Sequence, residues 1–177
     1  MRKNAFYLIV FVIVVCLCSC AHNGTNEDFI KYTSFDMLDS EYTPGDAVTD
    51  NCVVFVDSKI ISGHSIWANF ITKIDKGLSC NIRIANFSSD NTLFSLIDLS
   101  YSGSSFSVLT NDGLSKNYQY INHYEIEADN DEANYSTIDC YILTNQDNIT
   151  YKDIEKSLAS SILDDAIDHL IVYYDMR

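Results

Sequence analysis

The chain is poor in basic residues and in glycine, and these shortages exclude several common functions. It holds 11 lysines and arginines against 25 aspartates and glutamates, for a formal net charge of −14. Because the basic residues form no cluster, we expect neither nucleic acid nor an anionic lipid surface as a partner. The 6 glycines are too few and too scattered for a phosphate-binding loop.

Motifs of nucleophilic catalysis are also missing. The chain has no G-x-S-x-G segment, and none of Cys52, Cys80 and Cys140 lies in a C-x-x-C pair or near a histidine at ligand spacing. We expect Cys52, Cys80 and Cys140 to be small buried residues on strands. A single disulfide between two of them is the alternative. We therefore expect no cofactor and lean away from an enzyme.

The first twenty residues form a separate segment. Arg2 and Lys3 precede an unbroken apolar run over residues 5–17, and Leu17-Cys18-Ser19-Cys20 follows. A basic head, a short apolar run and small residues are typical of a secretory signal. The run is shorter than the roughly 18 residues of a good membrane-spanning candidate.

The four residues at 17–20 resemble the bacterial lipobox, in which a small residue precedes a cysteine that becomes lipidated. This resemblance implies a signal peptide over residues 1–19, cleavage before Cys20, and a lipid anchor such as palmitate on Cys20. We expect the protein to lie on the cell membrane and to face outside the cytoplasm. An uncleaved membrane anchor is the alternative.

Cleavage would leave 158 of the 177 residues, a length that suits one domain. Loss of Arg2 and Lys3 would take the net charge from −14 to −16. Residues 20–41 are polar and without periodicity, so we interpret them as a tether. Part of this tether could dock on the domain through Phe29, Tyr32, Phe35 and Met37. The domain itself is expected over residues 42–177.

The hydrophobic pattern of this domain changes from helical to alternating and back. A capped turn is expected at 43–48, helices at 65–76 and from Thr150, and strands at 53–56, 80–84, 94–101, 106–110, 118–126, 138–142 and 170–174. Ser65 and Thr150 are the expected caps, and Gly77 ends the first helix. The expected apolar stripes consist of Ile66, Trp67, Phe70, Ile71 and Ile74 on the first helix, and of Tyr151, Ile154, Leu158 and Ile162 on the second. Successive strands without helices between them indicate antiparallel pairing. We predict an α+β fold, a single antiparallel-rich sheet with two helices packed on one face.

Several short segments share a pattern with known lipoproteins. The residues concerned are 42–44, 46–48, 59–60, 67, 70–71, 76–77, 82–84 and 98–103. Together they resemble a family of small lipoproteins of Gram-positive bacteria that is known only as a domain of unknown function. The resemblance covers residues 42–108 and implies a membrane location and a fold, but no activity. Members often carry a Thr-x-Glu-Gly-Asp-Pro-like turn where this chain has residues 88–92, so that turn is altered here.

The acidic turn around Asp129, Asp131 and Glu132 is the best cation candidate, because calcium binds several carboxylate oxygens. The turn lacks the central glycine and distal glutamate of an EF-hand, so it would be a weak site at most. A solvated hairpin tip is the favoured interpretation.

Two histidines also lie near carboxylates. His169 follows an acidic segment at residues 164–168, and His123 shares a strand face with Glu125 and Glu127. Either could serve a metal-assisted enzyme, although a polar connector and a surface histidine are the ordinary alternatives.

Two further groups of residues have structural alternatives. Tyr118, Tyr120 and Tyr124 are expected on one strand face, which would be a binding surface if exposed and core if covered. Arg83 is expected to pair with Asp98 on the next strand, which is likelier than an anion site.

Three functions remain open. The favoured one is a non-catalytic extracytoplasmic binding or accessory module for an envelope protein or a small ligand. The others are a metal-assisted enzyme using carboxylates near His169 or His123, and a structural envelope lipoprotein.

Overall fold

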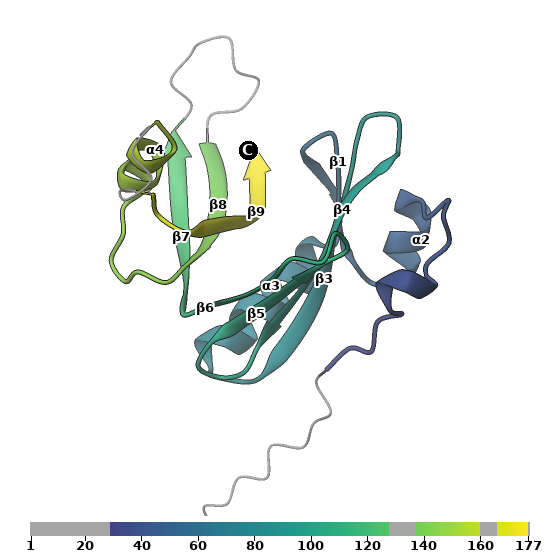
Figure 1. Cartoon of the computed structure of the whole chain (residues 1–177), viewed down its shortest axis with the longest axis horizontal. Coiled ribbons are helices and arrows are strands. Elements are labelled where there is room, and N and C mark those ends of the chain that lie inside the picture. The colour runs from purple at the N-terminus through teal and green to yellow at the C-terminus, as the bar shows by residue number, and fades with distance from the viewer. Residues whose placement is uncertain (1–28, 128–136, 160–165, 177) are drawn as a thin grey trace, which may run out of the picture.

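The structure is a computed structural model that describes residues 29–127, 137–159 and 166–176. It confirms a mixed protein of helices and strands in which strands predominate (Figure 1). Its elements in chain order are the 3-10 helix η2 (Phe35–Met37), α2 (Pro44–Thr49), β1 (Val53–Val56), β2 (Lys59–Ser62), α3 (His64–Asp75), β3 (Cys80–Phe87), β4 (Leu93–Tyr101), β5 (Phe106–Thr110), β6 (Ser115–Tyr118), β7 (Tyr120–Glu127), β8 (Thr137–Thr144), α4 (Tyr151–Ala159) and β9 (His169–Met176).

The strands form two sheets, so the expectation of a single sheet is wrong. A six-stranded sheet has the order β2-β1-β3-β4-β5-β6, and a three-stranded sheet has the order β7-β8-β9. Every neighbouring pair is antiparallel except β1 and β3, which are parallel because α3 carries the chain back between them. The predicted strand over 118–126 divides at Gln119, whose N–H donates to the Thr144 carbonyl of β8 at 3.2 Å.

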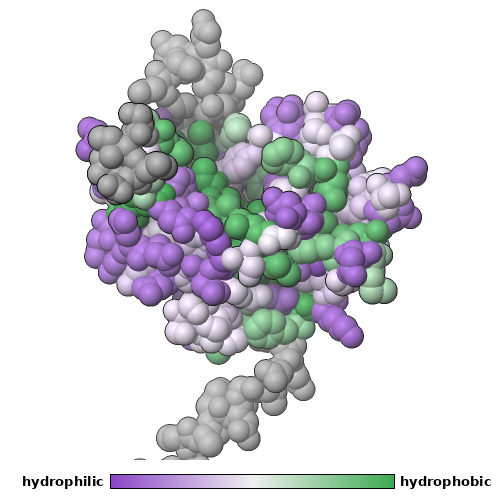
Figure 2. Space-filling view, in the orientation of Figure 1, coloured by the Kyte–Doolittle hydropathy of each residue, from purple (hydrophilic) through white to green (hydrophobic). Residues whose placement is uncertain are grey.

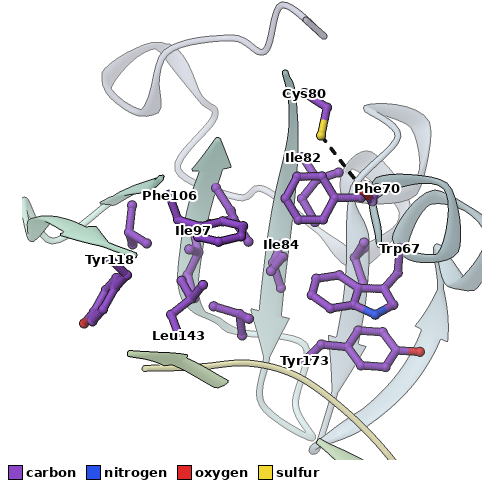
Figure 3. Packing of buried hydrophobic residues seen from close by; sticks show 14 of the residues in the cluster. Trp67, Phe70, Cys80, Ile82, Ile84, Ile97, Phe106, Tyr118, Leu143 and Tyr173 are labelled. Atoms are coloured by element: carbon purple, nitrogen blue, oxygen red, sulfur yellow. Dashed lines mark hydrogen bonds between the residues drawn. The ribbon is translucent and has the colours of Figure 1, made fainter. Parts of the chain in front are cut away.

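The main hydrophobic core lies on one face of the larger sheet, which α3 and the smaller sheet cover together. Trp67 and Phe70 of α3 are buried there, and Ile66, Ile71 and Ile74 pack against the cluster, which confirms the predicted apolar face of this helix. The smaller sheet contributes Leu143, Val172 and Tyr173 to the same cluster (Figure 3). The two sheets and α3 therefore share one core.

The opposite face of the larger sheet is covered by the N-terminal segment, α2 included. Tyr32, Phe35 and Leu38 pack against a second buried cluster. The core of that cluster consists of Tyr42, Ala47, Cys52, Val54, Ala85, Phe87 and Leu96. The predicted docking is therefore present for Tyr32 and Phe35, whereas Phe29 and Met37 are exposed. The boundary at residue 42 stays a prediction.

Helix α4 packs on the outer face of the smaller sheet, where Ile154 contacts the cluster of Cys140 and Ile142. The two predicted helices thus lie on different sheets and do not share one face. Leu158, predicted on the apolar stripe, is 68% exposed because the stripe of this short helix faces the sheet mainly through Ile154. Ile162 lies outside the described residues.

The predicted helix ends are partly confirmed. Thr43 and Asp46 form a reciprocal capping box at α2, and Thr150 and Asp153 make the same contacts at α4. Helix α3 begins at His64 after Gly63, so the predicted Ser65 cap is wrong. Gly63 has φ +94°, and a Cβ there would meet the Val53 Cα at 2.7 Å, so this position requires glycine.

The cysteines of the domain are small buried residues, as expected. Cys52, Cys80 and Cys140 are all buried. Burial raises the pKa of the Cys52 and Cys140 thiols to about 11 each, because the charged thiolate is poorly solvated there. Within the described ranges, no helix is long and apolar enough to cross a bilayer.

Candidate functional site

Two hollows are candidates for a site. The apolar groove, about 610 Å³, lies between the end of the larger sheet and the smaller sheet. Figure 2 shows apolar surface running between these two parts. The walls of the apolar groove include Phe55, Ile97, Ile171 and Tyr174. Phe94 also lines the groove, and this side chain is 82% exposed.

The second hollow, the aromatic–acidic pocket, has a volume of about 380 Å³ and lies between α3 and the smaller sheet. It is lined by His64, Trp67, Ala68, Ile71, Asp139, Tyr141, Tyr173 and Asp175. The strand register explains this set, because Asp139 lies opposite Asp175 and Tyr141 lies opposite Tyr173. Alternate residues of a strand share a face, so all four side chains are on the side of the sheet that faces α3.

Aromatic rings make up one wall of this pocket. Trp67 stacks on Tyr173 with ring centroids 4.4 Å apart and an angle of 10° between the planes (Figure 3). Tyr141 meets Trp67 edge-on at 5.1 Å and Tyr173 edge-on at 5.8 Å. On its other side, Tyr141 stacks with His123 at 4.4 Å. Each ring is therefore held by two or three others, which makes the wall rigid.

Ionisable groups lie beside these rings. His123 Nε2 is 3.1 Å from Asp139 Oδ1, and the Asp139 side chain is buried. His64 Nδ1 lies 3.2 Å from the Tyr173 hydroxyl and 4.0 Å from Asp175 Oδ2. Both imidazoles are about half exposed, with side-chain exposures of 46% and 57%, whereas the carboxylates are more buried. The histidines thus form the rim and the carboxylates the inner wall.

Trp67 carries an unsatisfied donor in this wall. The residue is 4% exposed, and its Nε1–H is the one buried side-chain polar atom without a hydrogen-bond partner among the described residues. A buried unpaired donor costs about 1–3 kcal/mol. No acceptor of the described chain pairs with this donor.

The predicted cation sites are not assembled by the described residues. Asp129, Asp131 and Glu132 lie outside them, as do Cys20, Asp164 and Asp165. His169 Nδ1 lies 2.8 Å from the Ile167 carbonyl, and Asp168 pairs with Lys116 at 2.7 Å. Across residues 29–127, 137–159 and 166–176, no three His, Cys, Asp or Glu side chains gather as metal ligands.

The predicted tyrosine face does not exist as one surface, because the break at Gln119 divides it between the two sheets. Tyr118 is 2% exposed in the main core, and Tyr120 is exposed. Tyr124 is half-buried under the turn before α4, where its hydroxyl donates to the Ile149 carbonyl at 2.8 Å.

The predicted pair between Arg83 and Asp98 is confirmed as a structural contact. Arg83 Nε and Nη2 donate to the two Asp98 carboxylate oxygens at 2.6 and 2.7 Å. The remaining Nη1 donates to the Thr33 carbonyl at 2.8 Å, and the guanidinium lies over the Tyr32 and Phe35 rings at 4.8 and 4.6 Å. This side chain is satisfied within the protein and offers no anion site.

Sequence reasoning missed the aromatic–acidic pocket. A signal was present: Asp139 and Tyr141 are two residues apart in one strand, as are Tyr173 and Asp175 in another. Acids on a strand face that is otherwise apolar point to a local function. Comparisons with family models, curated proteins and solved structures find no match to this chain.

Proposed function

We propose that this chain is an exported lipoprotein, anchored through lipid on Cys20, whose folded part binds a ligand in the aromatic–acidic pocket. Export and lipid anchoring are supported by the secretory pattern of residues 1–19 and the lipobox-like residues before Cys20. The observation that carries the binding role is the combination of aromatic rings and carboxylates around one hollow. Aromatic side chains together with a few placed polar groups recur at ligand sites.

A binding screen can test this role with an internal reporter. Trp67 is the one tryptophan of the chain, so ¹⁵N-labelled protein has a single indole N–H signal. We expect some member of a panel of cationic, neutral and anionic small molecules to shift this signal saturably. If no compound shifts it, the pocket is not a ligand site.

Two neighbouring tyrosines provide a matched pair of variants for the screen. Tyr173→Phe removes a hydroxyl at the pocket, and Tyr174→Phe makes the same change on the side of the apolar groove. Tyr173→Phe should weaken binding about threefold to tenfold, the effect of one lost hydrogen bond, and Tyr174→Phe should not. Equal effects of the two changes would place the ligand elsewhere.

The anchor is tested separately in cells. Cys20→Ala should leave the precursor uncut and without lipid, whereas Cys18→Ala should be processed normally. The measurement is incorporation of labelled palmitate together with the length of the chain by mass spectrometry. Normal labelling of Cys20→Ala would contradict the proposed anchor.

An enzyme is a second candidate, which one observation favours. The buried Asp139 carboxylate contacts His123 Nε2 at 3.1 Å, and such a contact can orient an imidazole as a general base. Chromogenic esters, phosphoesters and glycosides, with and without zinc or magnesium, would reveal turnover. Activity should be lost in His123→Gln and kept in His169→Gln; turnover that survives His123→Gln would exclude this site.

A further inference from the structure

We infer that the protein stands on the membrane with one end of α3 against the lipid surface, so that the aromatic–acidic pocket lies away from the bilayer. This inference rests on the proposed lipid anchor and not on the proposed binding role. The docking surface, here named the proximal end, consists of Phe29, Ile30, the last turn of α3 and Leu78. Its occupant is the bilayer that carries the anchor.

The chain enters the fold at a fixed point. The Ile30 N–H donates to the side-chain oxygen of Asn81 at 2.7 Å, and the Asn81 amide donates back to the Ile30 carbonyl at 2.8 Å. Figure 1 shows these first described residues, in purple, leading away below the larger sheet. Cys20 and Phe29 are nine positions apart in the sequence, so even a fully extended chain spans at most about 30 Å between them. The entry point therefore stays close to the lipid surface.

Exposed apolar side chains surround this entry point. Phe29 is 46% exposed, Ile30 40% and Leu78 42%. Ile30 and Leu78 both adjoin Lys73, because the Leu78 N–H donates to the Lys73 carbonyl at 2.9 Å and Ile30 lines a small hollow together with Lys73. Single exposed apolar residues are ordinary on a protein surface. Three of them where a lipid-anchored chain enters the fold can be buried in the membrane interface, which removes their apolar area from water.

Charge favours the same orientation. The chain carries a net charge of −14, so an anionic membrane repels most of its surface. Lys31, Lys73 and Lys76 belong to the proximal end. Their charges balance those of Asp75 and of the two acids at residues 27–28. The proximal end is therefore close to neutral, and it approaches the lipid with less repulsion than an average part of this acidic chain.

The aromatic–acidic pocket lies toward the other end of the same helix. Its lining from α3 comes from the first part of the helix, between His64 and Ile71, whereas Ile30 adjoins the part around Lys73. The 12 residues of α3 give it a length of about 18 Å. With the C-terminal end of α3 at the lipid, His64 lies up to about 18 Å farther from the bilayer, on the side from which a dissolved ligand arrives.

Fluorescent probes at the two ends of the larger sheet test this orientation. The mature chain with its lipid on Cys20 would be reconstituted into vesicles of phosphatidylcholine with a minority of phosphatidylglycerol. Leu78→Cys places a polarity-sensitive probe at the proximal end. Phe94→Cys is the matched control, because Phe94 is also apolar and exposed but lies about 23 Å along β4 from Tyr101, the strand partner of Cys80. The unchanged chain, labelled in the same way, gives the background from the buried thiols.

The probe at Leu78 should shift its emission to shorter wavelength on reconstitution and lose intensity when the lipid headgroups carry nitroxide. The probe at Phe94 should do neither. Equal quenching at the two positions, stronger quenching at Phe94, or quenching at neither in a chain that carries lipid would overturn the orientation and leave the anchor intact. If mass spectrometry finds no lipid on Cys20 and the chain stays in solution, the anchor fails and the orientation fails with it. Circular dichroism confirms that both variants are folded before their spectra are compared.

Discussion

The buried contact between Arg83 and Asp98 makes a quantitative prediction about stability. Arg83 is 1% exposed, and its guanidinium is held by Asp98, by the Thr33 carbonyl and by two aromatic rings. Asp98→Ala removes the carboxylate and leaves the cation in place. The change therefore exposes the cost of burying an arginine without its charge partner.

The expected cost follows from burial. Removing one member of a buried ion pair costs about 3–5 kcal/mol. The Asp98 side chain is 28% exposed, so water can reach the vacated position and the lower end of the range, about 3 kcal/mol, applies. A double variant, Arg83→Met with Asp98→Leu, removes both charges and should cost much less than Asp98→Ala alone, because apolar residues of similar volume fill the position.

Urea unfolding followed by Trp67 fluorescence and circular dichroism measures these free energies. The matched control is Asp168→Ala, which breaks the surface pair with Lys116, whose side chains are 40% and 52% exposed. That change should cost no more than about 0.5 kcal/mol. If Asp98→Ala is as mild as Asp168→Ala, or milder than the double variant, Arg83 is not a buried structural cation.

Three further predictions follow from the packing and the thiols. A chain that begins at Glu41 lacks the Thr33 carbonyl and the two aromatic rings that contact the Arg83 guanidinium. It should be less stable by about 3 kcal/mol than a chain that begins at residue 29. Equal urea midpoints would mean that residues 29–40 are only a tether. Phe70→Ala should lower the free energy of unfolding in urea by about 3–5 kcal/mol, because Phe70 is buried. Asn69→Ala, at the exposed neighbouring position, should lower it by about 0.5 kcal/mol or less. Similar values for the two variants would mean that α3 does not face the core. Burial raises the pKa of the Cys52 and Cys140 thiols from 9.0 to about 11, so the buried neutral thiols stabilise the folded state fully below pH 9, and this stabilisation is lost as the pH rises through 11. The free energy of unfolding should therefore fall less steeply between pH 9 and pH 11 in Cys52→Ala and Cys140→Ala than in the unchanged protein. Equal slopes would contradict the burial argument.

Local structure was predictable wherever one short segment determines it. The Thr43 cap, the buried strand at 53–56, the apolar face around Phe70 and the strand at 106–110 all appear as expected. Each depends on a periodicity or a capping pattern within about ten residues. Tertiary contacts reinforce these preferences and do not oppose them.

The number of sheets was not predictable, because the residue that divides them carries no turn signal. Gln119 stands between two strand-like segments without glycine or proline, so the pattern indicates one strand. The β1–β2 hairpin was missed for a related reason: Asp57 and Ser58 take positive φ values of 49° and 65° without a glycine. The aromatic–acidic pocket depends on how the smaller sheet meets α3, which no local pattern contains.

The division at Gln119 has a consequence for how the protein folds. The six-stranded sheet comes from one continuous stretch of sequence, residues 53–118, and the three-stranded sheet from the stretch that follows. Because a polypeptide is made from its N-terminus, the strands of the larger sheet emerge before the strands that cover part of its face. Until β8 and β9 arrive, the apolar residues that later contact Leu143 and Tyr173 are open to water and to other chains. Aggregation during synthesis or transit is therefore the hazard built into this order of strands, and a partner that shields this face would act before the native state forms.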